Sequence, residues 1–176
     1  MGKTDTKRQM KIGIFSPYWL MSGGGEKYLL TIASHLSQFN KVYLFADRSI
    51  ITLARRKFGL DLGRVEFLPP EKIYQSGLFG KILLTSRFDI IFYMTDGSLF
   101  FSAARKNFLM VQSPVHIPAK SPVNSLKMLN WKIICYSQFM RKIIEKRLGS
   151  QAIILSPEID PGKYQSKAKN KENIIL

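Results

Sequence analysis

The chain has 176 residues, of which 45% are hydrophobic and 22% are charged, so its composition is that of an ordinary globular domain. This length suffices for one domain with a substantial core and is too short for two full α/β domains. Lysine and arginine number 27 against 12 acidic residues. The resulting net charge of +15 predicts attraction to polyanions such as nucleic acid, anionic lipid headgroups or phosphorylated substrates.

The cellular environment is also constrained by the sequence. Cys135 is the single cysteine, which excludes an intrachain disulfide and suits a reducing cytoplasm. Its apolar neighbours predict a buried structural thiol. No stretch approaches the ~18 apolar residues of a membrane span. The apolar stretch at residues 12–15 is too short for the hydrophobic region of a signal peptide. We therefore expect a cytoplasmic protein whose membrane contact, if any, is peripheral and on the cytoplasmic face.

Short apolar runs alternate with segments of helical periodicity along the chain. Residues 1–10 are polar and basic and are expected to form a disordered tail. In chain order, we then expect a strand at 11–16, a glycine-rich turn at 22–25, a helix at 26–38, a strand at 41–46, a helix at 50–58, a strand at 65–68, a helix at 78–86, a strand at 89–94, a short helix at 98–105, a strand at 107–112, a loop at 113–122, a helix at 123–129, a strand at 132–136, a helix at 138–148 and a strand at 152–155.

The predicted strands are nearly continuous hydrophobic runs, which is typical of a parallel sheet covered by helices on both faces. Because parallel crossovers are almost always right-handed, the alternation predicts a single Rossmann-like, doubly wound α/β domain over residues 11–164. Ligands of such sheets bind beyond the carboxyl ends of the strands. Residues 165–176 are expected to be a linker and the start of a further domain, since 173–176 (NIIL) look like the opening of a strand.

Gly23, Gly24 and Gly25 lie between the first predicted strand and the first predicted helix. A helix N-terminus presents unpaired N–H groups and a partial positive charge, and glycines let an anion approach the backbone closely. The pattern suits a phosphate or pyrophosphate, although a loop without a ligand is an equal alternative from the glycines alone. The dinucleotide-binding pattern G-x-G-x-x-G is excluded because Tyr28 occupies its third glycine position, and no Walker A pattern is present.

Four stretches, residues 11–38, 136–142 (YSQFMRK), 154–160 (ILSPEID) and 171–176 (KENIIL), carry a resemblance to a known family. In order and spacing they resemble the N-terminal half of the retaining GT-B glycosyltransferases often called family 4. The resemblance covers most of the chain. No single one of its motifs is specific, but together they form a consistent set.

The resemblance implies a two-domain enzyme that transfers a sugar, with retention, from a nucleotide-diphosphate sugar to a saccharide or lipid-linked acceptor, with no cofactor and no required metal. It implies that the first domain holds the acceptor and that its loop, here Gly23, Gly24 and Gly25, faces the donor diphosphate. The family's donor site carries two glutamates eight residues apart, and none of the glutamates here has that spacing. The C-terminal donor domain is therefore expected to be missing from this sequence, and the chain alone to be inactive.

Further polar residues are candidates for the same site. His116, in the loop after a strand, is a catalytic candidate because the family often places such a side chain near the transferred sugar; a plain loop histidine is an equal alternative. Ser113, in the same loop, is an acceptor-side candidate. Asp96 is a second catalytic candidate, although a simple turn is slightly favoured. Glu26 is an acceptor-side candidate, but a helix dipole by itself favours an acid there. Lys27 is unfavourable at that helix end, which favours a phosphate-facing role.

One face of the predicted helix at 138–148 carries the basic residues Arg141, Lys142, Lys146 and Arg147. Contact with an anionic membrane and an ordinary solvated surface are equal alternatives for this face. Nucleic acid is not an expected partner, because no basic-aromatic stacking platform, helix-turn-helix or zinc-ligand pattern is present. The competing function is a non-catalytic α/β module that binds a nucleotide or another polyanion.

Overall fold

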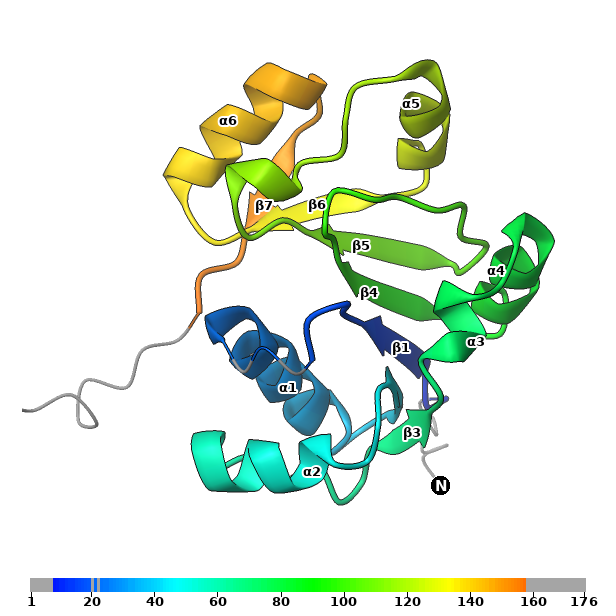
Figure 1. Ribbon diagram of the computed structural model, residues 1–176, viewed down its shortest axis with the longest axis vertical. Coiled ribbons are helices and arrows are strands. Elements are labelled where there is room, and N and C mark those ends of the chain that lie inside the picture. Colours follow the sequence, from blue (N-terminus) through cyan, green and yellow to red (C-terminus); the bar gives the residue numbers. More distant parts are fainter. Residues whose placement is uncertain (1–7, 20, 22, 158–176) are drawn as a thin grey trace, which may run out of the picture.

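Parallel strands form from the apolar runs of the sequence, and helices form from most of the segments between them, as the computed structural model shows (Figure 1). The structure describes residues 8–19, 21 and 23–157. The strands are β1 (Lys11–Phe15), β2 (Lys41–Phe45), β3 (Glu66–Leu68), β4 (Ile90–Met94), β5 (Lys106–Met110), β6 (Lys132–Cys135) and β7 (Ala152–Ile154). The α-helices are α1 (Gly24–Leu36), α2 (Ile50–Leu53), α3 (Glu71–Tyr74), α4 (Leu78–Thr85), α5 (Pro122–Met128) and α6 (Gln138–Leu148), with a π-helical turn η1 (Ala54–Phe58) and a 3-10 turn η2 (Pro114–His116). Of the tail expected at residues 1–10, residues 8–10 are exposed and outside any helix or strand, and residues 1–7 lie outside the described residues. The linker and new strand expected at 165–176 also lie outside them.

The seven strands form one parallel sheet in the order β3-β2-β1-β4-β5-β6-β7. The chain runs outward from β1 to β3, returns to place β4 beside β1, and then runs outward in the opposite direction to β7. Ile12 of β1 pairs with Val42 of β2 on one side and with Ile90 of β4 on the other. This arrangement confirms the predicted single, Rossmann-like, doubly wound α/β domain.

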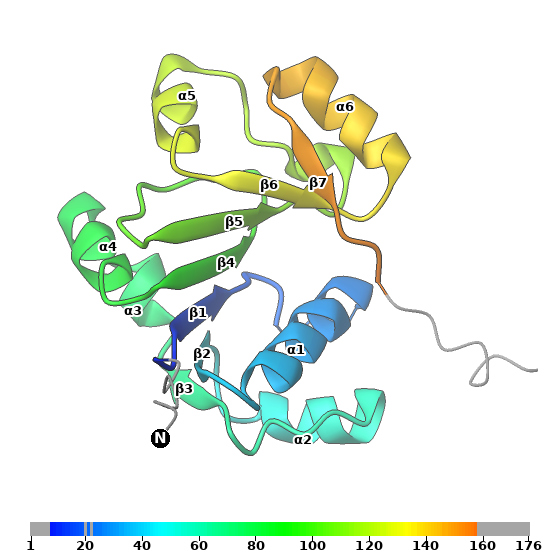
Figure 2. The ribbon, with the colours of Figure 1, turned by 180° about the vertical axis from the view of Figure 1, so that it is seen from behind.

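Helices cover both faces of the sheet (Figure 2). Side chains at alternate positions of each strand point to opposite faces, so Ile14 and Phe15 belong to two different clusters of buried residues. The cluster around Ile14 includes Leu29 and Leu30 of α1. The cluster around Phe15 includes Ile144 of α6 and is completed by side chains of α3, α4 and α5. The free thiol of Cys135 is buried in this second cluster, which confirms its predicted structural position.

Two elements differ from the sequence prediction. The segment at 98–105 is not helical, because its backbone carbonyls bond to side chains of other elements instead of to one another. The indole N–H of Trp131 donates to the carbonyl of Phe100, and the amide of Asn107 donates to that of Ala104. Helix α3 was not expected, since the two prolines before it indicated only the end of a strand.

Asp89 connects the amino ends of neighbouring strands. Its Oδ2 accepts a 2.9 Å hydrogen bond from the backbone N–H of Lys11, and its Oδ1 accepts one of 3.3 Å from Arg105. The bond from Lys11, opposed by slight burial and assisted by Arg105, holds the pKa of Asp89 below its usual range.

The substitution Asp89→Asn is expected to lower the free energy of unfolding at neutral pH by about 1–2 kcal/mol, because charge-assisted hydrogen bonds are weakened. A carboxyl whose pKa is lowered by folding stabilises the protein above its unfolded pKa, and this contribution disappears as the pH falls through the folded pKa. The free energies of unfolding of the wild-type chain and Asp89→Asn, measured with urea, should therefore become equal at acidic pH. A stability difference that stays constant with pH would contradict this role.

Candidate functional site

The candidate site lies at the carboxyl edge of β1, β4 and β5, where the direction of winding reverses between β1 and β4. In open parallel sheets this position leaves a crevice between connections that diverge to opposite faces, and ligands bind there. The segments that leave these strands carry most of the polar residues singled out in the sequence. The described residues contain no cluster of three or more histidine, cysteine or acidic side chains suited to a metal ion.

The N-terminus of α1 begins at Gly24 and not at residue 26, with Gly23 as the N-cap in extended conformation. The backbone N–H of Gly23 donates a 2.7 Å hydrogen bond to the carboxylate of Glu26, which is only 4% exposed. Glu26 is thus a capping residue that uses one of the donors at this end of the helix. The N–H groups of Gly24 and Gly25 lie in the first turn, where a helix provides no carbonyl partner. Gly24 is exposed and Gly25 is buried, so anion binding by these N–H groups stays a prediction.

Gly25 is needed for close packing against the loop that follows β5. A Cβ atom built at this position would overlap the side-chain amide of Gln112, which also contacts the sulfur of Met94. The third glycine of the turn therefore lets a side chain from the segment after β5 lie directly against the start of α1. In this way the tertiary structure explains a glycine that the sequence linked only to a ligand.

His116 bridges two segments of the site. Its Nε2 is 3.3 Å from the hydroxyl of Tyr18 in the β1–α1 loop, and its Nδ1 is 3.3 Å from the hydroxyl of Ser113. The rings of His116 and Tyr18 are also in contact, with centroids 5.4 Å apart. Because both hydroxyls can donate or accept, the imidazole is fixed in position while either of its tautomers is accommodated. Turn η2 follows β5 and holds His116 at the carboxyl edge of the sheet, beside the β1–α1 loop.

Asp96 lies in a tight turn after β4. Its Oδ1 accepts hydrogen bonds from the backbone N–H of Ser98 at 3.0 Å and from the hydroxyl of Tyr93 at 3.2 Å, and Gly97 has a positive φ of 101°. Partial burial opposes ionisation, but the hydrogen bonds from Ser98 dominate and hold the pKa of Asp96 below its usual range. The carboxylate is therefore a hydrogen-bond acceptor near neutral pH and a weak base.

Tyr28 of α1 and Tyr136, just after β6, pack together near the end of β7. Their rings are 4.9 Å apart in an edge-on contact, and the hydroxyl of Tyr28 donates a 2.9 Å hydrogen bond to the carbonyl of Leu155. Burial raises the pKa of Tyr28 to about 12 and also raises the pKa of Tyr136. The hydroxyl of Tyr136 is buried and has no hydrogen-bond partner within the described residues.

The remaining candidates lie on helices. The backbone of Lys27 continues α1 by donating to the carbonyl of Gly23, and its partly buried side chain forms no ion pair with any described residue. On α6, Arg141 pairs with Glu145 at 2.8 Å, and Arg147 donates a 2.7 Å hydrogen bond to the carbonyl of Pro114 in η2.

The four basic residues expected on α6 thus divide into two pairs. Arg141 and Arg147 are bonded within the protein, whereas Lys142 and Lys146 are exposed. Phe139, in the first turn of α6, is 67% exposed although it is apolar.

The fold resembles that of HepE from Anabaena. The crystal structure of HepE in complex with UDP and glucose superposes with a TM-score of 0.57 and 19% sequence identity, covering 90% of this chain. The chain spans 47% of the length of HepE. Comparison of the sequence with known protein families and with curated proteins gives no match. Within the described part of the chain, helices are too short or too polar to cross a membrane.

Several residues of the site were not identified from the sequence: Tyr18, Gln112, Tyr93, Tyr28 and Tyr136. Tyr18 and Gln112 directly follow β1 and β5, so the rule that strand ends converge could have indicated them. Tyr136 directly follows β6, so the same rule could have indicated it. The tyrosines on β4 and α1 gave no such signal, because an aromatic residue beside an apolar run is normally part of the core.

Glu26→Gln is expected to strengthen the binding of pyrophosphate by about five-fold, since it removes a like charge from the helix end while an amide oxygen can still cap Gly23. The free energy of unfolding should fall by about 0.5–1 kcal/mol with the loss of the charge–dipole interaction. Calorimetric titration and urea unfolding measure the two effects. Weaker pyrophosphate binding would show instead that Glu26 contacts the ligand or a positively charged group beside it.

Proposed function

We propose that this chain is the acceptor-binding half of a retaining glycosyltransferase, which moves a sugar from a nucleotide-diphosphate donor to a saccharide or lipid-linked acceptor. The observation that carries the proposal is the grouping of polar residues at the carboxyl edge of the sheet. Tyr18 contacts His116, which contacts Ser113, and burial together with the nearby charges of Asp96 and Glu26 raises the pKa of Tyr18. This combination offers hydroxyl, imidazole and carboxylate groups that suit a sugar, and we assign the N–H groups at the start of α1 to the diphosphate.

The likeness to HepE supports the proposal through the fold, and HepE itself was crystallised with UDP and glucose. Because the chain spans 47% of HepE, we propose that a second domain outside these 176 residues supplies the opposite wall of the donor site. The donor would then be held between two domains. The chain alone would bind ligands weakly and would not transfer sugar.

The chemistry of each polar group at this edge suggests its role in sugar transfer. Negative charge builds on the departing diphosphate as the bond to the sugar breaks, and the N–H groups of Gly24 and Gly25, with Lys27 nearby, can stabilise that charge. His116, with both ring nitrogens near hydroxyls, is placed to hydrogen-bond the transferred sugar. The low pKa of Asp96 makes it a poor proton acceptor, so we assign it to orienting acceptor hydroxyls. This scheme assigns no role to a metal.

The test is a titration of the isotope-labelled chain with UDP-glucose, followed by amide NMR. The amides of Gly24, Gly25 and His116 should shift together, with saturation in the millimolar range expected for half a site. Sugar transfer should be absent for the chain alone. Shifts confined to another surface, or measurable transfer by the 176-residue chain, would contradict the proposed division of the site.

A further inference from the structure

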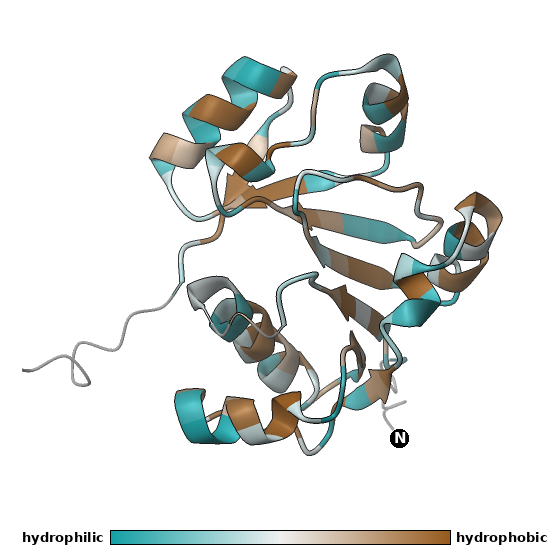
Figure 3. Ribbon diagram, viewed as in Figure 1, coloured by the Kyte–Doolittle hydropathy of each residue, from teal (hydrophilic) through white to brown (hydrophobic). Residues whose placement is uncertain are grey.

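Helix α4 presents an apolar face to the outside of the molecule. Phe79 is 82% exposed and Leu83, four residues later, is 63% exposed, so the two side chains lie together on one side of the helix. Leu78, at the first position, is 51% exposed. Thr85 and Leu84 face the sheet instead. Figure 3 shows the hydrophobic colour of α4 at the outer edge of the domain. A group of exposed apolar side chains rimmed by polar residues marks an interaction surface.

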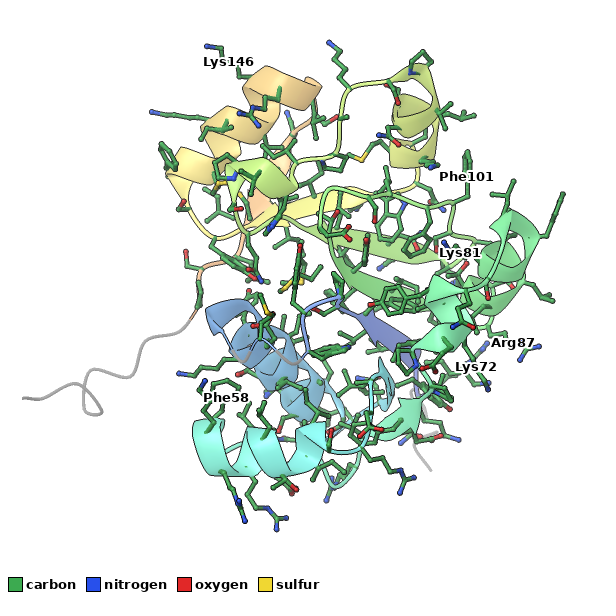
Figure 4. All side chains as sticks on the ribbon, viewed as in Figure 1. Phe58, Lys72, Lys81, Arg87, Phe101 and Lys146 are labelled. Carbon is green, nitrogen blue, oxygen red and sulfur yellow. The ribbon has the colours of Figure 1, made fainter. Side chains whose placement is uncertain are left out.

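Basic side chains surround this apolar face. Lys72 of α3 and Arg87, just after α4, line a pocket of about 440 Å³ beneath the helix, together with Lys11 at the start of β1. Tyr43 and Phe88 contribute apolar walls to the pocket. Figure 4 shows Lys72 and Arg87 on the α3–α4 side of the domain, with Lys81 nearby.

The charges of this face are available for a partner. No ion pair involves Lys72 or Arg87 within residues 8–19, 21 and 23–157. Both side chains belong to exposed residues. The acidic residue Glu71 adjoins Lys72 in sequence, but the whole chain carries a net charge of +15. A negatively charged partner is therefore favoured at this position.

We propose that Leu78, Phe79, Leu83, Lys72 and Arg87 form a docking surface for an anionic lipid bilayer. Aromatic and aliphatic side chains beside cationic ones are the combination that binds the headgroup region, where apolar side chains enter the acyl boundary and basic groups meet lipid phosphates. We call these five residues the α4 docking surface. They are distinct from the basic face of α6 that the sequence singled out.

The two surfaces differ in what they can offer a membrane. On α6, Arg141 and Arg147 are occupied by Glu145 and by the carbonyl of Pro114, which leaves Lys142 and Lys146 beside the exposed Phe139. The α4 docking surface has three exposed apolar side chains and two cations without ion-pair partners in the described chain. The α4 docking surface can therefore bind a bilayer through both apolar and electrostatic contacts, to a greater extent than the face of α6.

The pocket beside the α4 docking surface includes Lys11 at the amino end of β1, so this surface is separate from the candidate site at the carboxyl edge. The inference goes beyond sugar transfer and does not depend on it, because bilayer binding is measured without any nucleotide or sugar.

The experiment is cosedimentation of the full chain with vesicles of phosphatidylcholine alone and of phosphatidylcholine mixed with phosphatidylglycerol. We expect binding to the anionic vesicles only, weakened by salt. Phe79→Ser/Leu83→Ser should reduce the partition coefficient at least about tenfold, because two apolar side chains no longer enter the interface. Lys72→Gln/Arg87→Gln should reduce it by about five-fold for each charge removed.

The matched control is Lys142→Gln/Lys146→Gln, which removes the same number of charges from α6 and should cause a smaller loss. Circular dichroism verifies that each variant is folded, as expected for exposed positions. The proposal is overturned if the wild-type chain does not bind anionic vesicles. It is also overturned if Phe79→Ser/Leu83→Ser binds normally, which would indicate diffuse attraction by the net charge, or if the α6 variant loses more affinity than the α4 variants.

Discussion

Trp19→Ala is expected to lower the free energy of unfolding by about 3–5 kcal/mol, the cost of truncating a large buried aromatic side chain. Trp19 is 6% exposed and packs in the cluster beneath α1, and its indole N–H donates a 2.8 Å hydrogen bond to the carbonyl of Phe45 at the end of β2. This contact anchors the β1–α1 loop to the sheet. The substitution should therefore also weaken ligand binding at the start of α1.

Trp131→Ala is the matched control for Trp19→Ala. Trp131 is also 6% exposed and also donates its indole N–H to a backbone carbonyl, that of Phe100, but it lies in the other cluster, away from α1. Urea unfolding should show similar destabilisation of both variants. Under conditions where both are folded, only Trp19→Ala should weaken UDP binding. Equal weakening in both would show that the binding loss reflects general destabilisation and not the loop.

Gly24→Val is expected to raise the Kd for UDP by at least about tenfold, which corresponds to the loss of one good charge-assisted contact. Gly24 is exposed in the first turn of α1, and a Cβ atom added there would meet no other atom within 4 Å. The isopropyl group would therefore leave the protein undisturbed but would cover the N–H groups offered to an anion. The free energy of unfolding should change by no more than about 1 kcal/mol.

Gly77→Val provides the same change at the start of α4, where an added Cβ is equally free of contacts. Isothermal titration of both variants with UDP should show weaker binding for the substitution at Gly24 alone. The anion-binding role of α1 would be contradicted by wild-type affinity in Gly24→Val. A parallel loss in both variants would place the ligand elsewhere.

Much of the fold could be predicted because strands and helices have characteristic local patterns of apolar and polar residues. The apolar run at residues 90–94 becomes a buried central strand. Ser137, a residue type that favours helix starts, caps α6 by accepting a hydrogen bond from the backbone N–H of Met140. Predictions were wrong where tertiary contacts replace local ones. Residues 98–105 have helix-compatible composition, yet the carbonyls of Phe100 and Ala104 are bonded to Trp131 and Asn107.

The candidate site could be predicted in outline only. Glycines before a helix indicate donors for an anion, and His116 and Asp96 were expected at the carboxyl edge because each follows a strand. The sequence could not show that Glu26 uses one donor as a cap or that Arg147 supports η2 by bonding to Pro114. Such contacts depend on how the side chains are placed in the folded protein, and the spacing of residues along the chain does not indicate them.

The sequence by itself determined the alternation of strands and helices, the parallel sheet and the glycine turn at the start of α1, since these follow from local periodicity and backbone preferences. Only the tertiary structure decided which segments meet. Tyr18 and His116 are 98 positions apart and touch because β1 and β5 lie on the two sides of β4 in the sheet. On α4, Phe79 and Leu83 are exposed although they are apolar, because burial depends on which face of a helix the neighbouring elements cover.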